Sequence, residues 1–409
     1  MRVFYGGREI FMLNCTHYGF LFCILINSLY FCGIEIAISS ALSLLKWRFE
    51  NRIKYITTMD RKENFQPDYT NILKVLYNQR PDYLPLYEHH IDTPFITKCT
   101  GETLEIVSNK PAELEDYYRK IIRFWTNNGY DAFDYEAAIC DIIPGHGAIM
   151  GGMSGPIQTR DDFRKYPFDD IPKIFWETYT PRLEAIRRVM PPGMKAYGGC
   201  GYGIFESAQD LVGYESLCLM QYLDPELFAD LFTRIGDLFV ELWSKMVRYY
   251  ADIFVFHRMG DDLGHKTATM LEPDTIRKFV LPQHKRVIDI VHAAGKKFLL
   301  HCCGNIFDVM PDILACGIDA KHSNEDQISP FDVWIEKYGD QIGLFGGFDM
   351  NFLILNPYEV VFEKVTEEGA RFRAAANGYG LGSGNSIPDY MSIDGFNAMV
   401  DAVFEIRRS

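Results

Sequence analysis

The sequence is short of basic residues and has no low-complexity composition. Its 409 residues include 41 lysines and arginines against 55 aspartates and glutamates, which gives a net charge of −14. Proteins that bind nucleic acid usually present a basic surface to the phosphates, so this balance argues against a nucleic-acid partner. With 48% hydrophobic and 23% charged residues, the chain has enough apolar material for a folded core. We therefore expect a globular protein that acts on a small-molecule substrate.

Two phosphate-binding motifs are also missing. No Gly-x-Gly-x-x-Gly follows the first predicted strand, and the glycine-rich segments 144–147 and 151–155 are not followed by Gly-Lys-Ser or Gly-Lys-Thr. The first absence excludes the usual dinucleotide fingerprint, and the second excludes a P-loop. The ten cysteines show no disulfide-framework spacing. In a chain of this size that pattern predicts reduced thiols and a cytoplasmic location.

Residues 1–58 differ in composition from the rest of the chain. They hold six basic and three acidic residues, and residues 10–34 are uncharged. Twenty-five uncharged residues could span a bilayer as a helix, although Asn14, Thr16, His17 and Asn27 would be costly there. No clear small-x-small cleavage site of a secretory signal follows the run.

Three interpretations of this extension remain open. It is a membrane anchor, a dispensable extension, or an artefact of start-site choice in a protein whose translation begins at Met59. A membrane location is expected only if residues 10–34 are a true anchor. We therefore divide the chain into a hydrophobic N-terminal extension, residues 1–58, and a single folded domain, residues 59–409.

The folded domain alternates short apolar runs with longer helical patterns. Helix starts are marked by proline at the first helical position, as in Asp224-Pro225-Glu226, and Pro282 is expected to break or kink its helix. Eight strands with intervening helices predict a (β/α)8 TIM barrel, and an open doubly wound sheet is the alternative. The predicted strands are 83–87, 131–135, 195–198, 252–256, 297–300, 318–321, 342–346 and 378–382.

Polar residues collect where the predicted strands end. In a barrel these positions converge on one mouth, which is where the chemistry of such folds is found. Five of the ten histidines lie at these points. The residues are Glu88-His89-His90, Asp134-Tyr135-Glu136, His257, Asp261-Asp262, His301-Cys302-Cys303-Gly304, His322, Asp349 and Ser383-Gly384-Asn385.

His301-x-Cys303 is the sharpest local motif. An imidazole and a thiolate two residues apart can turn toward one tetrahedral cation, and this donor pair suits zinc. Further ligands would have to come from other loops. A buried thiol beside a hydrogen-bonded histidine, or Cys303 as a covalent nucleophile, are the alternatives. The candidates for additional ligands are Asn385, His257, His322 and Glu206.

Two acidic motifs complete the candidate site. Asp261-Asp262 is either a solvated turn or helix cap, or a pair in which one carboxylate binds a cationic or hydroxylated substrate group. Glu88-His89-His90 is either a polar loop or a source of general acid–base chemistry, because histidine titrates near neutrality.

Several of these motifs together resemble the uroporphyrinogen decarboxylase superfamily. The matching segments are Arg80-Pro81-Asp82, the Gly260–Gly264 turn, Pro273 with Phe279–Pro282, His301–Gly304, Gly346–Asp349 and Gly382–Asn385. The resemblance covers about residues 65–407 and implies a (β/α)8 barrel. The superfamily includes the decarboxylase of haem synthesis and corrinoid-linked methyltransferases such as methylcobalamin:coenzyme M methyltransferase.

The two branches differ in the residues that bind substrate or metal. The decarboxylase branch uses an Arg-Gln-Ala-Gly-Arg run after its first strand, where this chain has residues 87–92 and no arginine. The methyltransferase branch binds zinc through His-x-Cys and a later cysteine, and the bound zinc activates a thiol substrate. His301 and Cys303 match the first two positions, and Asn385 stands at the third.

The resemblance and the motifs together predict a zinc- and corrinoid-linked methyltransferase acting on a small substrate, with the corrinoid carried by a partner protein. Decarboxylation of uroporphyrinogen III and a non-catalytic, membrane-tethered binding protein are the alternatives. The expected roles are catalysis by Glu88, His89 and Asp262, substrate binding by His257, Asp261, His322, Asp349 and Ser383, and metal binding by His301, Cys303 and Asn385.

Overall fold

The computed structural model describes residues 2–5, 8–11, 65–151, 153–324 and 327–408. The chain divides into two compact units, Met1–Arg61 and Lys62–Ser409. In the first unit, β1 (Arg2–Tyr5) and β2 (Arg8–Phe11) pair antiparallel. Most of the uncharged run at 10–34, and Met59, lie outside the described residues. Within the described ranges, no helix has both the length and the apolar character needed to cross a bilayer.

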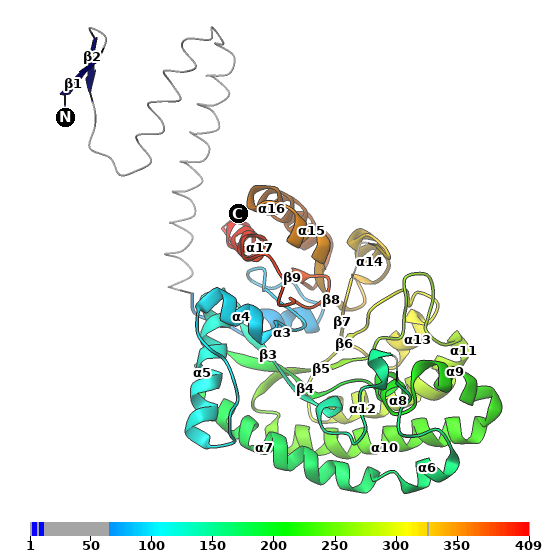
Figure 1. Cartoon of the computed structure of the whole chain (residues 1–409). Helices are drawn as coiled ribbons and strands as arrows, with labels where there is room; N and C mark the ends of the chain where they lie inside the picture. The colour runs from blue at the N-terminus through cyan, green and yellow to red at the C-terminus, as the bar shows by residue number, and fades with distance from the viewer. Residues whose placement is uncertain (1, 6–7, 12–64, 152, 325–326, 409) are drawn as a thin grey trace. The chain divides into compact units, whose positions relative to one another are not determined.

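The second unit is built on a curled, seven-stranded parallel sheet (Figure 1). Its strands lie side by side in the order in which they occur along the chain, as in a TIM-like barrel. The shortest of them, β7, has three residues and still pairs with both neighbours. The strands are β3 (Ala132–Ala138), β4 (Lys195–Gly201), β5 (Phe254–Gly260), β6 (Phe298–His301), β7 (Ala320–His322), β8 (Gly343–Phe348) and β9 (Tyr379–Ser383).

These strands confirm seven of the eight predicted strands. The prediction of the first strand, residues 83–87, is correct only in part. Residues 83–87 form an isolated parallel bridge, Leu86 with Leu381, in place of a regular strand. The amide of Tyr87 donates to the carbonyl of Leu381 at 2.9 Å, and the amide of Leu381 donates to Pro85 at 3.0 Å. Pro85 has no N–H to give to a ladder, which shortens the pairing of this segment.

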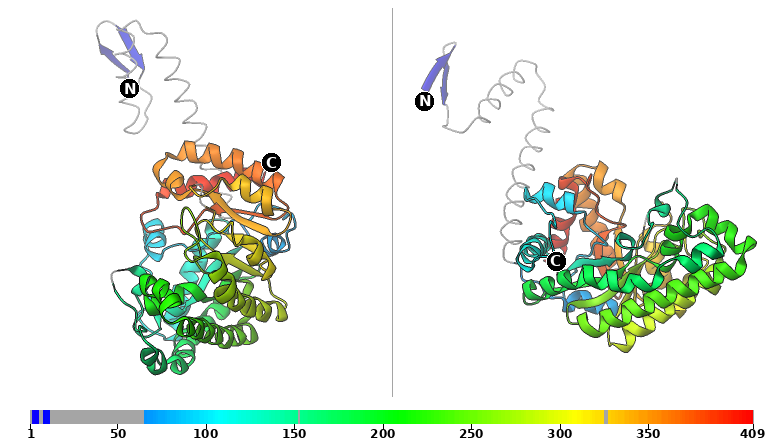
Figure 2. Two further views of the ribbon diagram at one scale, coloured as in Figure 1. Left: turned by 90° about the vertical axis from the view of Figure 1, so that its right-hand side faces the viewer. Right: turned by 60° about the horizontal axis from the view of Figure 1, so that its bottom comes forward.

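Helices cover the outer side of the sheet (Figure 2). Asp224 caps the longest of them through Leu227 N at 3.0 Å, as predicted. Pro282 lies in the first turn of α12, directly after a π-helical turn at Ile276–Val280, so the helix is interrupted where expected. The helices are α3 (Thr70–Leu76), α4 (Thr93–Thr100), α5 (Pro111–Asn127), α6 (Arg160–Lys165), α7 (Ile171–Val189), α8 (Ile204–Val212), α9 (Tyr214–Leu223), α10 (Pro225–Tyr250), α11 (Pro273–Thr275), α12 (Leu281–Ala293), α13 (Met310–Ala315), α14 (Phe331–Tyr338), α15 (Met350–Leu355), α16 (Tyr358–Ala375) and α17 (Ile393–Ile406).

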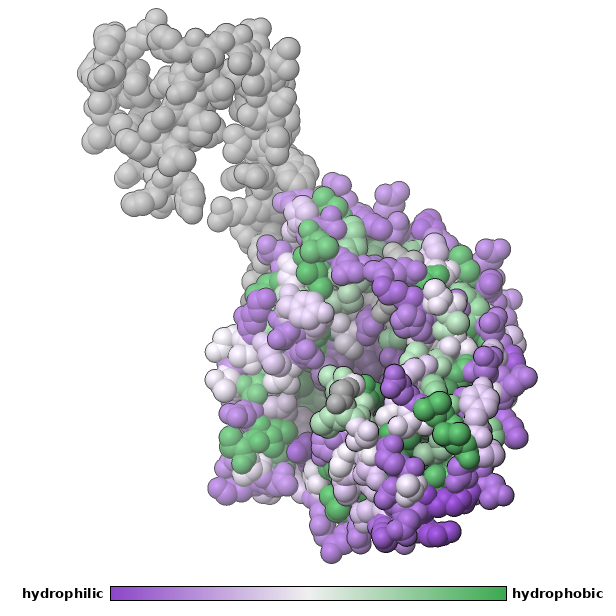
Figure 3. Space-filling view, turned by 45° about the vertical axis from the view of Figure 1, so that its right-hand side comes forward, coloured by the Kyte–Doolittle hydropathy of each residue, from purple (hydrophilic) through white to green (hydrophobic). Residues whose placement is uncertain are grey.

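Four aromatic side chains, Tyr87, Tyr197, Phe256 and Phe345, fill the inside of the curled sheet as an aromatic layer. All four are fully buried. The rings of Tyr197 and Phe256 stack at 5.2 Å between centroids, and those of Tyr87 and Phe345 lie 4.6 Å apart. Because Tyr197, Phe256 and Phe345 precede the carboxyl ends of β4, β5 and β8 by a few positions, the aromatic layer forms a floor beneath the strand ends. The outer face seen in Figure 3 is mostly hydrophilic, with scattered apolar patches.

The contact between residues 83–87 and β9 depends on Gly382. A Cβ atom added there would lie 1.7 Å from the carbonyl oxygen of Tyr87. We expect Gly382→Ala to lower the free energy of unfolding by about 3 kcal/mol, because two backbones must separate. Gly295→Ala, whose Cβ meets open space at a φ of +73°, should cost about 1–2 kcal/mol. Equal losses for the two variants in urea unfolding would contradict this account.

Candidate active site

The candidate site lies along the carboxyl ends of β5 to β9. Gly260 pairs with His301 and His301 with His322, so these residues form one row across three neighbouring strands. His301 and His322 are the last residues of β6 and β7, and Ser383 ends β9. Since carboxyl ends of parallel strands share one edge, the sequence motifs at these positions are brought together by the sheet itself.

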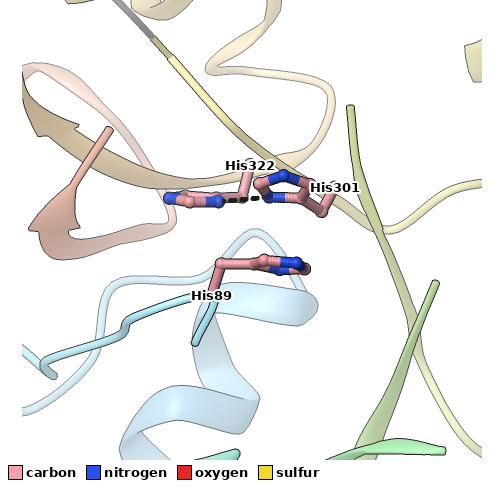
Figure 4. A group of neighbouring side chains, drawn as sticks. All are labelled: His89, His301 and His322. Carbon is pink, nitrogen blue, oxygen red and sulfur yellow. Dashed lines mark hydrogen bonds between the residues drawn. The ribbon is translucent and has the colours of Figure 1, made fainter. Parts of the chain in front are cut away.

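Three histidines are in contact at this edge (Figure 4). The rings of His89 and His301 stack with centroids 3.4 Å apart and an interplanar angle of 18°. Nδ1 of His301 lies 2.8 Å from Nδ1 of His322, and Nε2 of His322 lies 2.9 Å from the carbonyl oxygen of Ser383. Burial lowers the pKa of His322 to about 3 and lowers those of His89 and His301 well below their usual value. All three imidazoles are therefore neutral at physiological pH.

The hydrogen bonds fix the tautomers of His322 and His301. The carbonyl oxygen of Ser383 can only accept, so Nε2 of His322 carries the proton and donates. A neutral His322 then has a bare Nδ1, which accepts from Nδ1–H of His301. Nε2 of His301 consequently holds a lone pair, and Sγ of Cys303 lies 3.4 Å from it.

Two groups of possible metal ligands share His301, the three histidines and the set of Asp262, His301 and Cys303, and in each the ligand atoms lie within 4.8 Å of one another. Sγ of Cys303 lies 3.4 Å from Nε2 of His301, and Oδ1 of Asp262 lies 3.9 Å from the same nitrogen. The amide of Cys303 donates to Oδ1 of Asp262 at 2.8 Å. Burial, and then the charge of Asp262, raise the pKa of the Cys303 thiol well above its usual value. A thiolate at Cys303 therefore needs a cation beside it.

This donor set fits zinc. Imidazole nitrogen and thiolate sulfur are both common zinc ligands, and in a tetrahedral site their atoms lie about 3.4–3.6 Å apart. The separation of 3.4 Å between His301 and Cys303 matches that edge. The lone pair of His301 also faces the sulfur, so neither group would have to rotate far to reach a common ion.

Asn385 is close to this pair, with its amide nitrogen toward the sulfur. Nδ2 donates to Sγ of Cys303 at 3.6 Å. Oδ1 accepts from the amide of Ser386 at 2.8 Å, which fixes the orientation of the side-chain amide. The structure thus brings together all three residues that the sequence predicted as metal ligands, and it turns the NH2 group of Asn385, which cannot coordinate a cation, toward Cys303.

Glu88 is a buried acid that is hydrogen-bonded through Ser383 to the segment after β9. It is fully buried, and burial raises its pKa to about 8. Ser383 Oγ contacts both a carboxyl oxygen of Glu88 and the carbonyl oxygen of Asn385, yet a hydroxyl has one proton to donate. A protonated Glu88 resolves this, because it donates to Ser383 Oγ, which donates to Asn385. Glu88 is therefore a neutral hydrogen-bond donor near pH 7.

The raised pKa of Glu88 makes stability depend on pH. Between the usual pKa of 4.5 and the folded-state pKa of about 8, the native protein holds a proton that the unfolded chain releases. This contribution to the free energy of unfolding is complete below pH 4.5 and is lost by up to about 1.4 kcal/mol per pH unit as the pH rises toward 8. Glu88→Gln cannot ionise, so its urea-unfolding free energy should fall less between pH 6 and 8. Parallel profiles for the two proteins would contradict the assignment.

Three residues predicted to bind substrate have structural contacts elsewhere. His257 lies within β5, because that strand continues to Gly260, and its ring packs 5.4 Å from that of Trp243 on α10. Asp261 is buried and accepts from the amides of Phe205 and Glu206 at the start of α8, and from His284 at 2.5 Å. Asp349 caps α15 through Phe352 N at 3.1 Å.

Arg258 is a site residue that the sequence analysis missed. It is fully buried and pairs with Asp134 at 2.9 Å and with Glu136, and it donates to the carbonyl oxygen of His89. Burial alone would lower its pKa, but the charges of Asp134 and Glu136 raise it. An arginine inside an apolar strand must have buried anionic partners, and that expectation could have linked Arg258 with the acids after the second predicted strand.

Removal of the Arg258 cation should be strongly destabilising. Arg258→Leu leaves the carboxylates of Asp134 and Glu136, with side chains 6% and 23% exposed, without the guanidinium, although His90 and the amide of Tyr202 still contact them. We expect a loss of about 3–5 kcal/mol in the free energy of unfolding. Arg234→Ala removes a surface pair with Asp169, whose side chain is 96% exposed, and should cost less than about 1 kcal/mol. Thermal and urea unfolding would measure both, and a small loss for Arg258→Leu would contradict the role given to this ion pair.

One solved structure shows a clear likeness of fold. A methyltransferase from Methanosarcina mazei is 17% identical, with 82% of this chain and 98% of that one covered and a TM-score of 0.61, which is a likeness of fold. A D-psicose 3-epimerase with D-tagatose from Clostridium cellulolyticum H10 is 12% identical over 71% of this chain and 92% of its own, with a TM-score of 0.37. No curated protein matches the sequence significantly.

The family profile named uroporphyrinogen decarboxylase (URO-D) matches residues 136–406. This match covers more than half of the chain and contains β4 to β9, His301, Cys303 and Asn385. It confirms the resemblance found in the motifs. The chain belongs to the uroporphyrinogen decarboxylase family.

Proposed function

We propose that this protein is a methyltransferase that uses zinc at His301 and Cys303 and a corrinoid carried by a partner protein. The observation that carries the proposal is the pairing of Nε2 of His301 with Sγ of Cys303 at 3.4 Å, with the lone pair of the nitrogen held toward the sulfur. Zinc bound there would lower the pKa of a thiol or similar acceptor and make it nucleophilic.

The remaining residues of the site would orient the substrate and exclude water. Nδ1 of His89 is buried and has no hydrogen-bond partner within the described ranges, so a bound substrate would meet it. The neutral Glu88 would hold Ser383 and the segment that carries Asn385. In this scheme His89 contacts the substrate, whereas Glu88 and Ser383 are positioning residues.

The charge of the site favours methyl transfer over decarboxylation of a porphyrinogen. A substrate with many carboxylates needs cationic partners. The guanidinium of Arg258 is already paired with Asp134 and Glu136. Asp262, whose side chain is 41% exposed, adds negative charge near His301. An anionic tetrapyrrole would be repelled here, whereas a small thiol would not.

We also propose that the sheet closes into an eight-stranded barrel, with residues 83–87 in the place of the eighth strand. Its bridge to β9 supports one side of the closure. On the other side, Tyr197 of β4 donates to the carbonyl oxygen of Glu88, and Arg258 of β5 donates to that of His89. The segment around Tyr87 is thereby bonded to β9, at one end of the sheet, and to β4 and β5, the second and third strands from the other end.

The proposed location is the cytoplasm. The seven cysteines in the described part of the chain are free thiols: Cys99, Cys140, Cys200, Cys218, Cys302, Cys303 and Cys316. A reducing compartment would keep them free, and it would also keep Cys303 available as a metal ligand.

Metal analysis tests the zinc proposal. We expect about one zinc per chain in the unmodified protein and less than about 0.1 in His301→Ala and Cys303→Ser, because each change removes one of few protein ligands. His292 is a surface histidine on α12 that pairs with Asp319. The His292→Ala variant should bind as much zinc as the unmodified protein. Each protein would then be incubated with methylcobalamin and a thiol acceptor, and the formation of the thioether would be monitored. An unmodified protein without zinc would overturn the proposal.

A further inference from the structure

The proposed zinc site lacks its third protein ligand. The superfamily pattern has a cysteine where this chain has Asn385, and the amide oxygen of Asn385 is bonded to the amide of Ser386 at 2.8 Å. Its Nδ2 atom, which carries hydrogens and no available lone pair, faces Cys303. A catalytic zinc site usually has three protein ligands, so another side chain is needed.

The neighbouring Asp262 is placed to supply it. The carboxylate follows β5, and Gly260 at the end of that strand pairs with His301. Oδ1 of Asp262 lies 3.9 Å from Nε2 of His301, near the separation of about 3.4 Å expected for oxygen and nitrogen on one tetrahedral zinc. The amide of Cys303 donates to this carboxylate at 2.8 Å, which fixes the distance between the segment after β5 and the segment after β6.

We propose that Asp262 is the third protein ligand, so that the metal is held by a carboxylate oxygen, Nε2 of His301 and Sγ of Cys303. This proposal rests on the proposed function, because it concerns the same ion. It also accounts for charge. A carboxylate and a thiolate neutralise a divalent cation, as two thiolates would, whereas one thiolate and a neutral amide would leave a net positive charge in a buried site.

The three-histidine cluster is the competing donor set, and the contacts within it disfavour it. Two nitrogens bound to one tetrahedral zinc lie about 3.3 Å apart. The Nδ1 atoms of His301 and His322 are 2.8 Å apart, which is a hydrogen-bond distance. The rings of His89 and His301 are stacked at 3.4 Å, so an ion in the plane of one ring lies well outside the plane of the other. These contacts orient His301 and leave its Nε2 for the metal.

In this arrangement Asn385 has a different role from the cysteine it replaces. Its NH2 group donates to Sγ of Cys303 and would stabilise the thiolate once the metal is bound. Asn385 would then act through Cys303 as a positioning residue, whereas Asp262 would touch the ion directly.

The decisive variant is Asp262→Asn. An amide oxygen at residue 262 can still accept the hydrogen bond from the Cys303 amide, but it lacks the negative charge of a ligand carboxylate. We expect zinc affinity to fall at least ~100-fold in competition with a chromophoric chelator. In protein loaded with Co²⁺, the thiolate-to-cobalt charge-transfer band should be lost or shifted. Asn385→Ala should keep the metal and the band.

Asp210→Asn is the matched control, because Asp210 is a buried carboxyl on α8 that accepts from the amide of Gly147 at 2.6 Å and lies outside the donor set. It should bind zinc as the unmodified protein does. Unchanged thermal unfolding of all variants in chelator would show that the fold is intact.

If the unmodified protein binds zinc and Asp262→Asn binds it equally well, the ligand assignment alone is overturned. Loss of metal in Asn385→Ala with retention in Asp262→Asn would overturn it in favour of Asn385. An unmodified protein without zinc would overturn the proposed function as well.

Discussion

The hydrogen bond between the Nδ1 atoms of His301 and His322 is the interaction on which the candidate site depends. It lies at the ends of two paired strands, and it connects the backbone of β9 to the nitrogen that faces Cys303. Without it, a neutral His301 could carry its proton on either nitrogen, and only one of the two tautomers leaves Nε2 able to bind a cation. The sheet therefore determines both the position of His301 and its chemical state.

Burial makes this arrangement possible and also makes it costly. The site combines neutral histidines, a neutral glutamic acid and a buried arginine, and each is stable only because specific partners replace water. Arg258 compensates Asp134 and Glu136, while Ser383 Oγ accepts a hydrogen bond from the protonated Glu88. Asp262 and Cys303 differ from the rest, because burial and the neighbouring carboxylate raise the pKa of the thiol. A cation held by both groups would favour the thiolate, which is the physical argument for the proposed metal ion.

The sequence was most informative about the order of elements and least informative about side-chain direction. Seven strands lie where apolar runs predicted them, because buried parallel strands are apolar on both faces. His257 was misplaced because β5 continues past the apolar run to Gly260, which leaves its ring against α10. Arg258 was overlooked because it lies in the part of β5 beyond that run. The motif His301-x-Cys303 could be read directly, since both residues are close in sequence. The position of Asp262 relative to them depends on strand pairing, and no local pattern shows it.

The last acceptor in the histidine chain is a main-chain carbonyl, that of Ser383. Every amino acid at residue 383 would supply the same oxygen, so the tautomer of His301 is protected against side-chain substitution there. The serine hydroxyl serves a separate purpose, the contact with Glu88. Residue 383 and the buried acid can therefore be exchanged together without loss of the orientation of the His301 imidazole.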